Sequence, residues 1–232
     1  MHKEYRKGVQ HGFPIGLGYL SVSFGFGILA VGLNIPTLGA ILISATNLTS
    51  AGQAAGVEII AACGTLVEMI LTQLVINLRY ALMGFSLTQK LDHTFTTPKR
   101  LLLSFGITDE VYAVAISQKG RISASYMAGL ITLPIVGWTF GTTLGAYAGQ
   151  LLPTSMTNAM GILLYGMFIA IFLPVARKDK RVFVVVFIAA LCSILFKFCF
   201  KAVSSGFAII ICALVAAVIG ALFFPIGEEE EV

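Results

Sequence analysis

Four ionisable residues, Glu68, Arg79, Asp109 and Glu110, interrupt long apolar stretches of this 232-residue chain. An ionisable group inside a membrane costs roughly 2.5 to 3.5 kcal/mol on insertion scales, so such a residue is a functional candidate by default. Burial raises the pKa of a carboxyl group, and a nearby cation lowers it. The set could therefore load and release a proton near neutral pH. The alternative is a structural salt bridge that holds helices together.

The expected positions of these groups limit how they can pair. We expect Glu68 in the middle of an apolar helix, Arg79 at the end of that helix, and Asp109 and Glu110 in the middle of the next. Successive side chains on a helix point about 100° apart, so the two acids cannot both face one partner squarely. One acid is predicted to pair with Arg79 while the other titrates. Arg79 could instead extend to the membrane interface.

A run of small and amide side chains interrupts another apolar stretch at residues 44–56. Glycine lowers helix stability by about 1 kcal/mol relative to alanine, and freed backbone groups are tolerated in a membrane only against protein or a wet cavity. The run therefore predicts a broken helix whose ends could hold a zwitterionic ligand. The alternative is a polar seam of interhelical hydrogen bonds. The candidate ligand-binding residues are Asn47, Ser50, Gly52 and Gln53.

Glycine recurs every fourth residue at Gly137, Gly141, Gly145 and Gly149, which places the four on one face of a helix. Such a stripe lets a second helix approach closely. We expect tight packing within a helix bundle at this face. The alternative is a surface for sliding or for docking a partner.

Other reactive residue types give no sign of enzyme chemistry. The histidines are terminal or in a loop, and the four cysteines lie in apolar runs without the paired spacing of a metal site. Neither a Ser/His/Asp set nor a glycine-rich phosphate loop is recognisable. Charged residues cluster between apolar blocks and so mark loops, not a nucleic-acid surface. We expect no enzyme activity, cofactor, metal or nucleic-acid partner, and we expect Trp138 and Tyr147 to anchor at membrane interfaces.

The composition requires a lipid environment. Hydrophobic residues make up 57% of the chain and charged residues only 11%, with a mean hydropathy of +0.92. This leaves too little polar surface for a water-soluble globule. A helix needs roughly 20 apolar residues to cross a bilayer, and backbone groups in lipid must be satisfied internally, so runs of this length predict an all-α transmembrane bundle. The eight apolar segments are 12–34, 36–56, 58–78, 101–118, 124–149, 156–175, 182–200 and 203–224.

Basic residues indicate the orientation, because short loops rich in Lys and Arg stay in the cytoplasm. Lys3, Arg6 and Lys7 predict a cytoplasmic N-terminus. If all eight segments cross, the loop from Lys90 to Arg100 would lie outside, against this rule. An alternative makes part of 37–87 re-entrant and turns 101–118 back without crossing. We leave the number of full crossings open.

The whole chain, 1–232, is predicted to be a single integral membrane domain with a possible internal repeat. A motif at 34–42 resembles one at 152–164, and each joins a glycine-rich helix to its successor. Units of about 12–118 and 124–224 would then point the same way, as in the parallel repeats of some transporters.

Three motifs carry a family resemblance. Residues 44–55 with Gln53, the stretch 77–84 and the stretch 109–113 resemble, in order and spacing, the AzlC-type large subunit of branched-chain amino acid exporters. The resemblance implies efflux of leucine, valine and isoleucine, a small hydrophobic partner subunit of the AzlD type, and a bacterial cytoplasmic membrane. Ser50 to Gln53 depart from the family's glycine-alanine-alanine-glutamine, and Asn47 replaces an apolar residue. A more polar site could select a different substrate.

The leading hypothesis is a secondary transporter for branched-chain or similar neutral amino acids, driven by the proton gradient. A passive pore through the same polar seam is one alternative. A subunit that assembles in the membrane without transporting anything is another.

Overall fold

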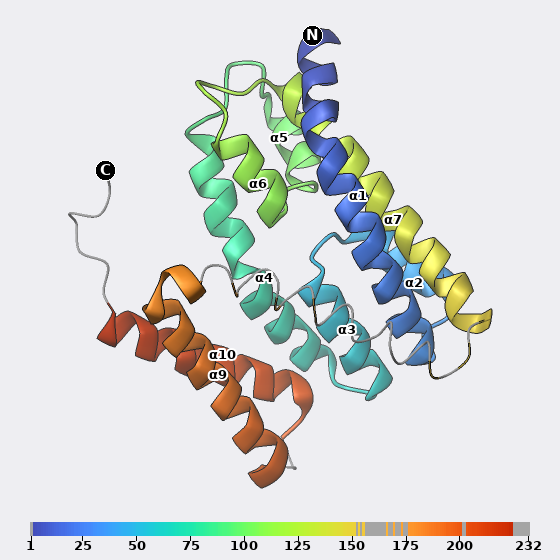
Figure 1. Ribbon diagram of the computed structural model, residues 1–232, viewed down its shortest axis with the longest axis vertical. Coiled ribbons are helices and arrows are strands. Elements are labelled where there is room, and N and C mark those ends of the chain that lie inside the picture. Colours follow the sequence, from blue (N-terminus) through green and yellow to red (C-terminus); the bar gives the residue numbers. More distant parts are fainter. Residues whose placement is uncertain are drawn as a thin grey trace.

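The computed structural model describes residues 2–151, 176–200 and 203–224, together with residues 153, 155, 166, 169 and 173. Within these residues the chain is helical apart from loops and one β-bridge, so the predicted all-α bundle is confirmed (Figure 1). In this described part of the chain, five helices are long and apolar enough to cross a membrane. They are α1 (His2–Gly32), α4 (Leu66–Thr88), α7 (Ala124–Leu151), α9 (Lys180–Cys199) and α10 (Ser205–Phe223). The segment predicted at 156–175 lies outside the described residues.

Helices α1 and α7 pack against each other along their full length and form the central pair of the bundle (Figure 1). They run in the same direction, because Gly16 meets Gly137 and Phe24 meets Gly145 in ascending order. A Cβ atom on either glycine of α7 would overlap the carbonyl oxygen of the α1 residue that it faces. The two backbones are therefore in direct contact, which only the missing side chain allows.

The predicted break at 44–56 is confirmed. Helix α2 (Thr37–Thr46) ends and α3 (Ala51–Ala61) begins across a four-residue tip, 47–50. Ser50 has φ +49°, a value that residues with a side chain rarely adopt, so the chain reverses sharply there. The side-chain oxygen of Asn47 accepts a hydrogen bond of 3.1 Å from the Thr49 amide, which satisfies one of the backbone groups that the break frees.

Helices α2 and α3 form a hairpin that returns to the end of the bundle where it starts. Ala40 of α2 and Val57 of α3 pack in one cluster with Ala30 and Ala146, near the C-terminal ends of α1 and α7. The tip lies about halfway along those helices, where Leu48 packs against buried partners. This part of the chain is therefore re-entrant.

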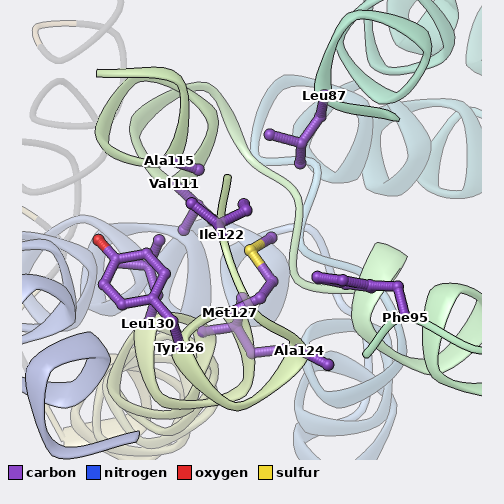
Figure 2. Packing of buried hydrophobic residues seen from close by; sticks show 10 residues of the cluster. Leu87, Phe95, Val111, Ala115, Ile122, Ala124, Tyr126, Met127 and Leu130 are labelled. Atoms are coloured by element: carbon purple, nitrogen blue, oxygen red, sulfur yellow. The ribbon is translucent and has the colours of Figure 1, made fainter. Parts of the chain in front are cut away.

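The prediction of one segment at 101–118 is wrong. Two eight-residue helices, α5 (Thr97–Ser104) and α6 (Asp109–Ile116), form a second hairpin instead. At its tip Thr108 caps α6, its hydroxyl accepting a hydrogen bond from the Val111 amide. Both arms of this hairpin pack at the N-terminal end of α7, in a cluster that includes Leu87, Phe95, Ala115 and Met127 (Figure 2).

The loops before and after this hairpin are hydrogen-bonded to each other. The Asp92 amide donates to the Ile122 carbonyl over 3.0 Å, and the Ile122 amide donates to the Lys90 carbonyl over 2.8 Å. Burial opposes ionisation of Asp92, but hydrogen bonds from the hydroxyl and amide of Thr94 prevail and lower its pKa. The basic residues of 90–100 and 119–121 therefore lie at the same end of the bundle. The eight-crossing arrangement, which places these two loops on opposite sides of the membrane, is wrong for this part of the chain. The re-entrant alternative agrees with the structure.

The order of elements repeats with inverted direction. Helix α1 is followed by a hairpin that returns to the end where α1 finishes, and α4 is followed by a hairpin that returns to the opposite end. Inverted repeats with interrupted helices are a common architecture of secondary transporters. The parallel repeat of units 12–118 and 124–224 stays a prediction, since much of 152–175 lies outside the described residues.

Helix α4 begins at Leu66, not at 58 as predicted, because the chain turns at Cys63, whose φ is +53°. Thr65 caps the helix, and its hydroxyl accepts a hydrogen bond of 3.1 Å from the Glu68 amide. Glu68 therefore lies in the first turn of α4 instead of at a segment centre. Arg79 lies inside α4 instead of closing it.

Candidate functional site

The tips of the two hairpins meet beside the midpoints of α1 and α7 and enclose a cavity of about 320 Å³, which we call the central cavity. This volume falls at the lower end of the range of small-molecule sites, about 300 to 1,000 Å³. The wall combines ionisable, hydroxyl and apolar side chains from α1, α4, α7 and both tips. The lining residues are Tyr19, Leu48, Ser50, Ala51, Ile76, Arg79, Tyr80, Thr108, Asp109, Glu110 and Trp138.

The two neighbouring acids have different partners. Arg79 forms an ion pair with Asp109, with 2.6 Å between Nη1 and Oδ2, and donates a second hydrogen bond to the Tyr80 hydroxyl. Glu110 accepts a hydrogen bond from the Tyr19 hydroxyl. The two acids are neighbours on α6 and point in different directions. Glu110 is therefore bound by the neutral hydroxyl of Tyr19, and Asp109 by the guanidinium of Arg79. Arg79 and Asp109 are 43% and 39% exposed, and both remain accessible from the cavity.

Two helices begin at the central cavity. Ser50 and Ala51 stand at the start of α3, and Thr108 and Asp109 stand at the start of α6. The first turn of a helix has backbone N–H groups without intrahelical acceptors and carries a partial positive charge. The two acids of α6 offset this charge at their own helix, whereas α3 has no acid in its first turn. The start of α3 and Arg79 therefore supply positive charge to the cavity, and Asp109 and Glu110 supply negative charge.

The remaining wall is apolar apart from one hydrogen-bond donor. Leu48 and Ile76 provide aliphatic surface, and Trp138 packs edge-to-face against Tyr19 with 5.2 Å between ring centroids. Trp138 is 1% exposed, so the predicted interface anchoring is wrong. Its indole N–H has no acceptor among the described residues.

The other predicted ligand-binding residues lie apart from the central cavity. Asn47, Gly52 and Gln53 line a neighbouring cavity of about 190 Å³, between the first hairpin and α4. The Gln53 amide donates a hydrogen bond of 3.1 Å to the Ser44 hydroxyl, which in turn shares one of 2.7 Å with Thr142. Of the four predicted residues, only Ser50 lies at the central cavity.

Gln73 and Asn77 are polar residues of α4 that the sequence analysis missed. The Gln73 amide donates a hydrogen bond of 2.7 Å to the Gly52 carbonyl, and its oxygen accepts one of 2.9 Å from Asn77. Two amide side chains four residues apart in an apolar helix lie on one face of that helix. This spacing could have indicated from the sequence that the face packs against polar groups. Gln73 and Asn77 thus join α4 to the first turn of α3, the second half of the broken helix.

Replacing Gln73 with leucine is expected to loosen this junction. The change leaves a donor of Asn77 without its acceptor and should lower the free energy of unfolding by about 1 to 3 kcal/mol. Thermal unfolding of the purified protein in detergent would measure the effect. Gln10→Leu, at an exposed position of α1, is the matched control. Equal melting temperatures for the two variants would contradict the role of Gln73.

Glu68 does not join the other ionisable residues. It is 3% exposed, and its Oε1 accepts hydrogen bonds of 2.6 Å from the Ser204 hydroxyl and 2.9 Å from the Gly206 amide. These groups belong to the start of α10, where a negative charge is favourable. Glu68 therefore attaches α10 to α4, and the predicted charge network reduces to Arg79, Asp109 and Glu110.

Comparison with known proteins places the chain in a family. The sequence profile described as AzlC protein matches residues 14–152. The inner membrane protein YgaZ of Escherichia coli is 28% identical, over 76% of this chain and 75% of its own length. An uncharacterized membrane protein of Archaeoglobus fulgidus is 30% identical, over 73% of this chain and 75% of its own length. No solved structure matches. The chain is therefore a membrane protein and belongs to the AzlC family.

Proposed function

We propose that this protein is a secondary transporter subunit that exports branched-chain or similar neutral amino acids across a bacterial cytoplasmic membrane. The observation that carries the proposal is the central cavity, which presents positive, negative and apolar surface within one small volume. A neutral amino acid has a carboxylate, an ammonium group and an apolar side chain around one carbon atom. These three features correspond to the three parts of the wall.

The charged parts of the cavity suggest a binding orientation. The carboxylate would accept hydrogen bonds from Arg79 and from the first amides of α3, since a guanidinium has five donors and Asp109 and Tyr80 do not occupy them all. The ammonium group would face Glu110 and Asp109. The aliphatic side chain would then lie against Ile76 and its apolar neighbours.

The basic loops support a cytoplasmic N-terminus. Residues 3–7, 90–100 and 119–121 all lie at the end where α1 and α7 begin, because the loops are hydrogen-bonded together and the His11 ring is hydrogen-bonded to Tyr126. Loops rich in Lys and Arg remain on the cytoplasmic side. The second hairpin would then enter from the cytoplasm and the first from outside.

Proton coupling is part of the proposal, with Glu110 as its centre. Asp109 is held by a cation, whereas the partner of Glu110 in the described residues is a neutral hydroxyl. Glu110 can therefore take up a proton without the loss of an ion pair. A small hydrophobic subunit of the AzlD type is the proposed partner, and the apolar surface of α9 is exposed to receive either lipid or such a subunit.

Proteoliposomes that contain both subunits would test the function. We expect saturable leucine flux with counterflow, increased by an imposed pH gradient. Glu110→Gln removes the carboxylate that the proposal assigns to both the proton and the ammonium group, so it should weaken leucine binding and abolish the response of the remaining flux to the gradient. Wild-type flux that ignores the gradient would remove the coupling proposal. The absence of flux for every neutral amino acid would remove the substrate proposal, and flux without saturation would indicate a pore.

A further inference from the structure

Two more cavities lie between the central cavity and the N-terminal end of the bundle. One of about 370 Å³ lies between the hairpin tips and shares Leu48 and Tyr80 with the central cavity. Another, of about 110 Å³, shares Gly84, Ser104 and Ile107 with the second cavity. Each cavity thus has wall residues in common with the next, so the three lie next to one another as a series.

The series follows one face of α4 toward the N-terminal end of the bundle. The α4 residues that line it are, in order, Ile76, Arg79, Tyr80, Ala81, Gly84, Leu87 and Thr88, and most of them are separated by three or four residues, as on one face of a helix. The last cavity is lined by Leu91, beside the loop pair that closes this end. The series therefore extends from the midpoint of the bundle toward its basic end.

We propose that this series is the passage by which the amino acid reaches the central cavity from the N-terminal end, with Leu48 and Tyr80 as the gate between them. The inference rests on the proposed function. An exported substrate must enter from the cytoplasm, which is the side assigned to this end. Arg100 stands at the outer cavity and attracts the carboxylate, while Leu87 and Ile107 accommodate an aliphatic side chain.

Gly84 is the position where the passage can be blocked without disturbing the fold. It lines both outer cavities, and a Cβ atom added there would meet no heavy atom within 4 Å. A larger side chain at this position therefore extends into free space. This behaviour differs from that of the α7 glycines, where a Cβ atom strikes the backbone of α1.

Leucine flux through Gly84→Phe proteoliposomes tests the passage. We expect flux to fall by about tenfold or more, because a substrate forced past an overfilled space meets a repulsive barrier. Gly18→Phe is the control and should transport at the wild-type rate, since Gly18 also has no heavy atom within 4 Å of an added Cβ and lies on α1. Wild-type flux through Gly84→Phe would overturn the proposal, and no flux in wild type would instead overturn the proposed function.

A thiol at the same position gives a second test if Gly84→Phe does not fold. Gly84→Cys is made in a chain whose four native cysteines are replaced by alanine. A bulky thiol reagent should then abolish leucine flux, a small methylating reagent should spare it, and leucine should slow the modification. Full modification by the bulky reagent without loss of flux would overturn the passage.

Discussion

Replacement of Gly145 by leucine is expected to prevent α1 from docking on α7. A Cβ atom at this position would overlap the backbone of Phe24, and a backbone cannot move aside as a flexible side chain can. Overpacking of this kind should lower the free energy of unfolding by about 3 kcal/mol. The measurement is the melting temperature and the monodisperse fraction of the protein in detergent.

Two glycine positions serve as controls for this result. At Gly149 an added Cβ would lie 3.4 Å from Ile28 Cα, and at Gly18 it would meet nothing within 4 Å. Gly149→Leu should therefore lower the free energy of unfolding less than Gly145→Leu does, and Gly18→Leu should lower it least. If Gly145→Leu melts like Gly18→Leu, the direct backbone contact between α1 and α7 is incorrect.

Replacement of Arg79 by alanine is expected to weaken leucine binding by about ten- to a hundredfold, the equivalent of losing a hydrogen bond between charged groups. The change also leaves Asp109 without its cation, so the two acids of the cavity would repel the carboxylate of leucine. The KM of leucine flux and the Kd of leucine binding would measure the effect. Arg79→Lys keeps the charge but not the planar fork and should recover only part of the affinity.

A matched control separates this effect from the loss of a positive charge elsewhere. Arg121 lies in the exposed loop at the basic end, and Arg121→Ala should leave the affinity for leucine unchanged. The double variant Arg79→Ala with Asp109→Ala should fold better than Arg79→Ala alone, because no carboxylate then lacks a partner. Unchanged affinity in Arg79→Ala would show that the substrate binds outside the central cavity.

The types of residue in a short stretch were informative where hydropathy alone was not. Small and amide residues at 44–56 predict a broken helix, and the break is found at 47–50. Hydropathy gave the wrong structure at 101–118, because two short apolar helices and one long apolar helix have the same mean hydropathy. A closer reading of Gly106 and Thr108, a flexible residue and a cap before two acids, would have indicated the tip. Thr65 and Glu68, spaced as a capping box, likewise mark the start of α4.

Contacts between distant parts of the chain could not be predicted. Nothing local connects Glu68 with Ser204, or Glu110 with Tyr19, and both partners depend on which helices pack together. Trp138 was placed at an interface by residue type, whereas its position opposite the hairpin tips buries it in the cavity wall. The sequence could thus predict a set of polar candidate residues. Only the fold shows which of these residues lie together at the central cavity.

Binding of leucine to the purified protein tests the central cavity most directly. Trp138 is the only tryptophan in the chain and lines the cavity, so its fluorescence should respond to an occupant. We expect a saturable change with leucine, and none with leucinamide, which lacks the carboxylate, or with 4-methylpentanoate, which lacks the ammonium group. An equal response to all three compounds, or no response to any neutral amino acid, would contradict this expectation.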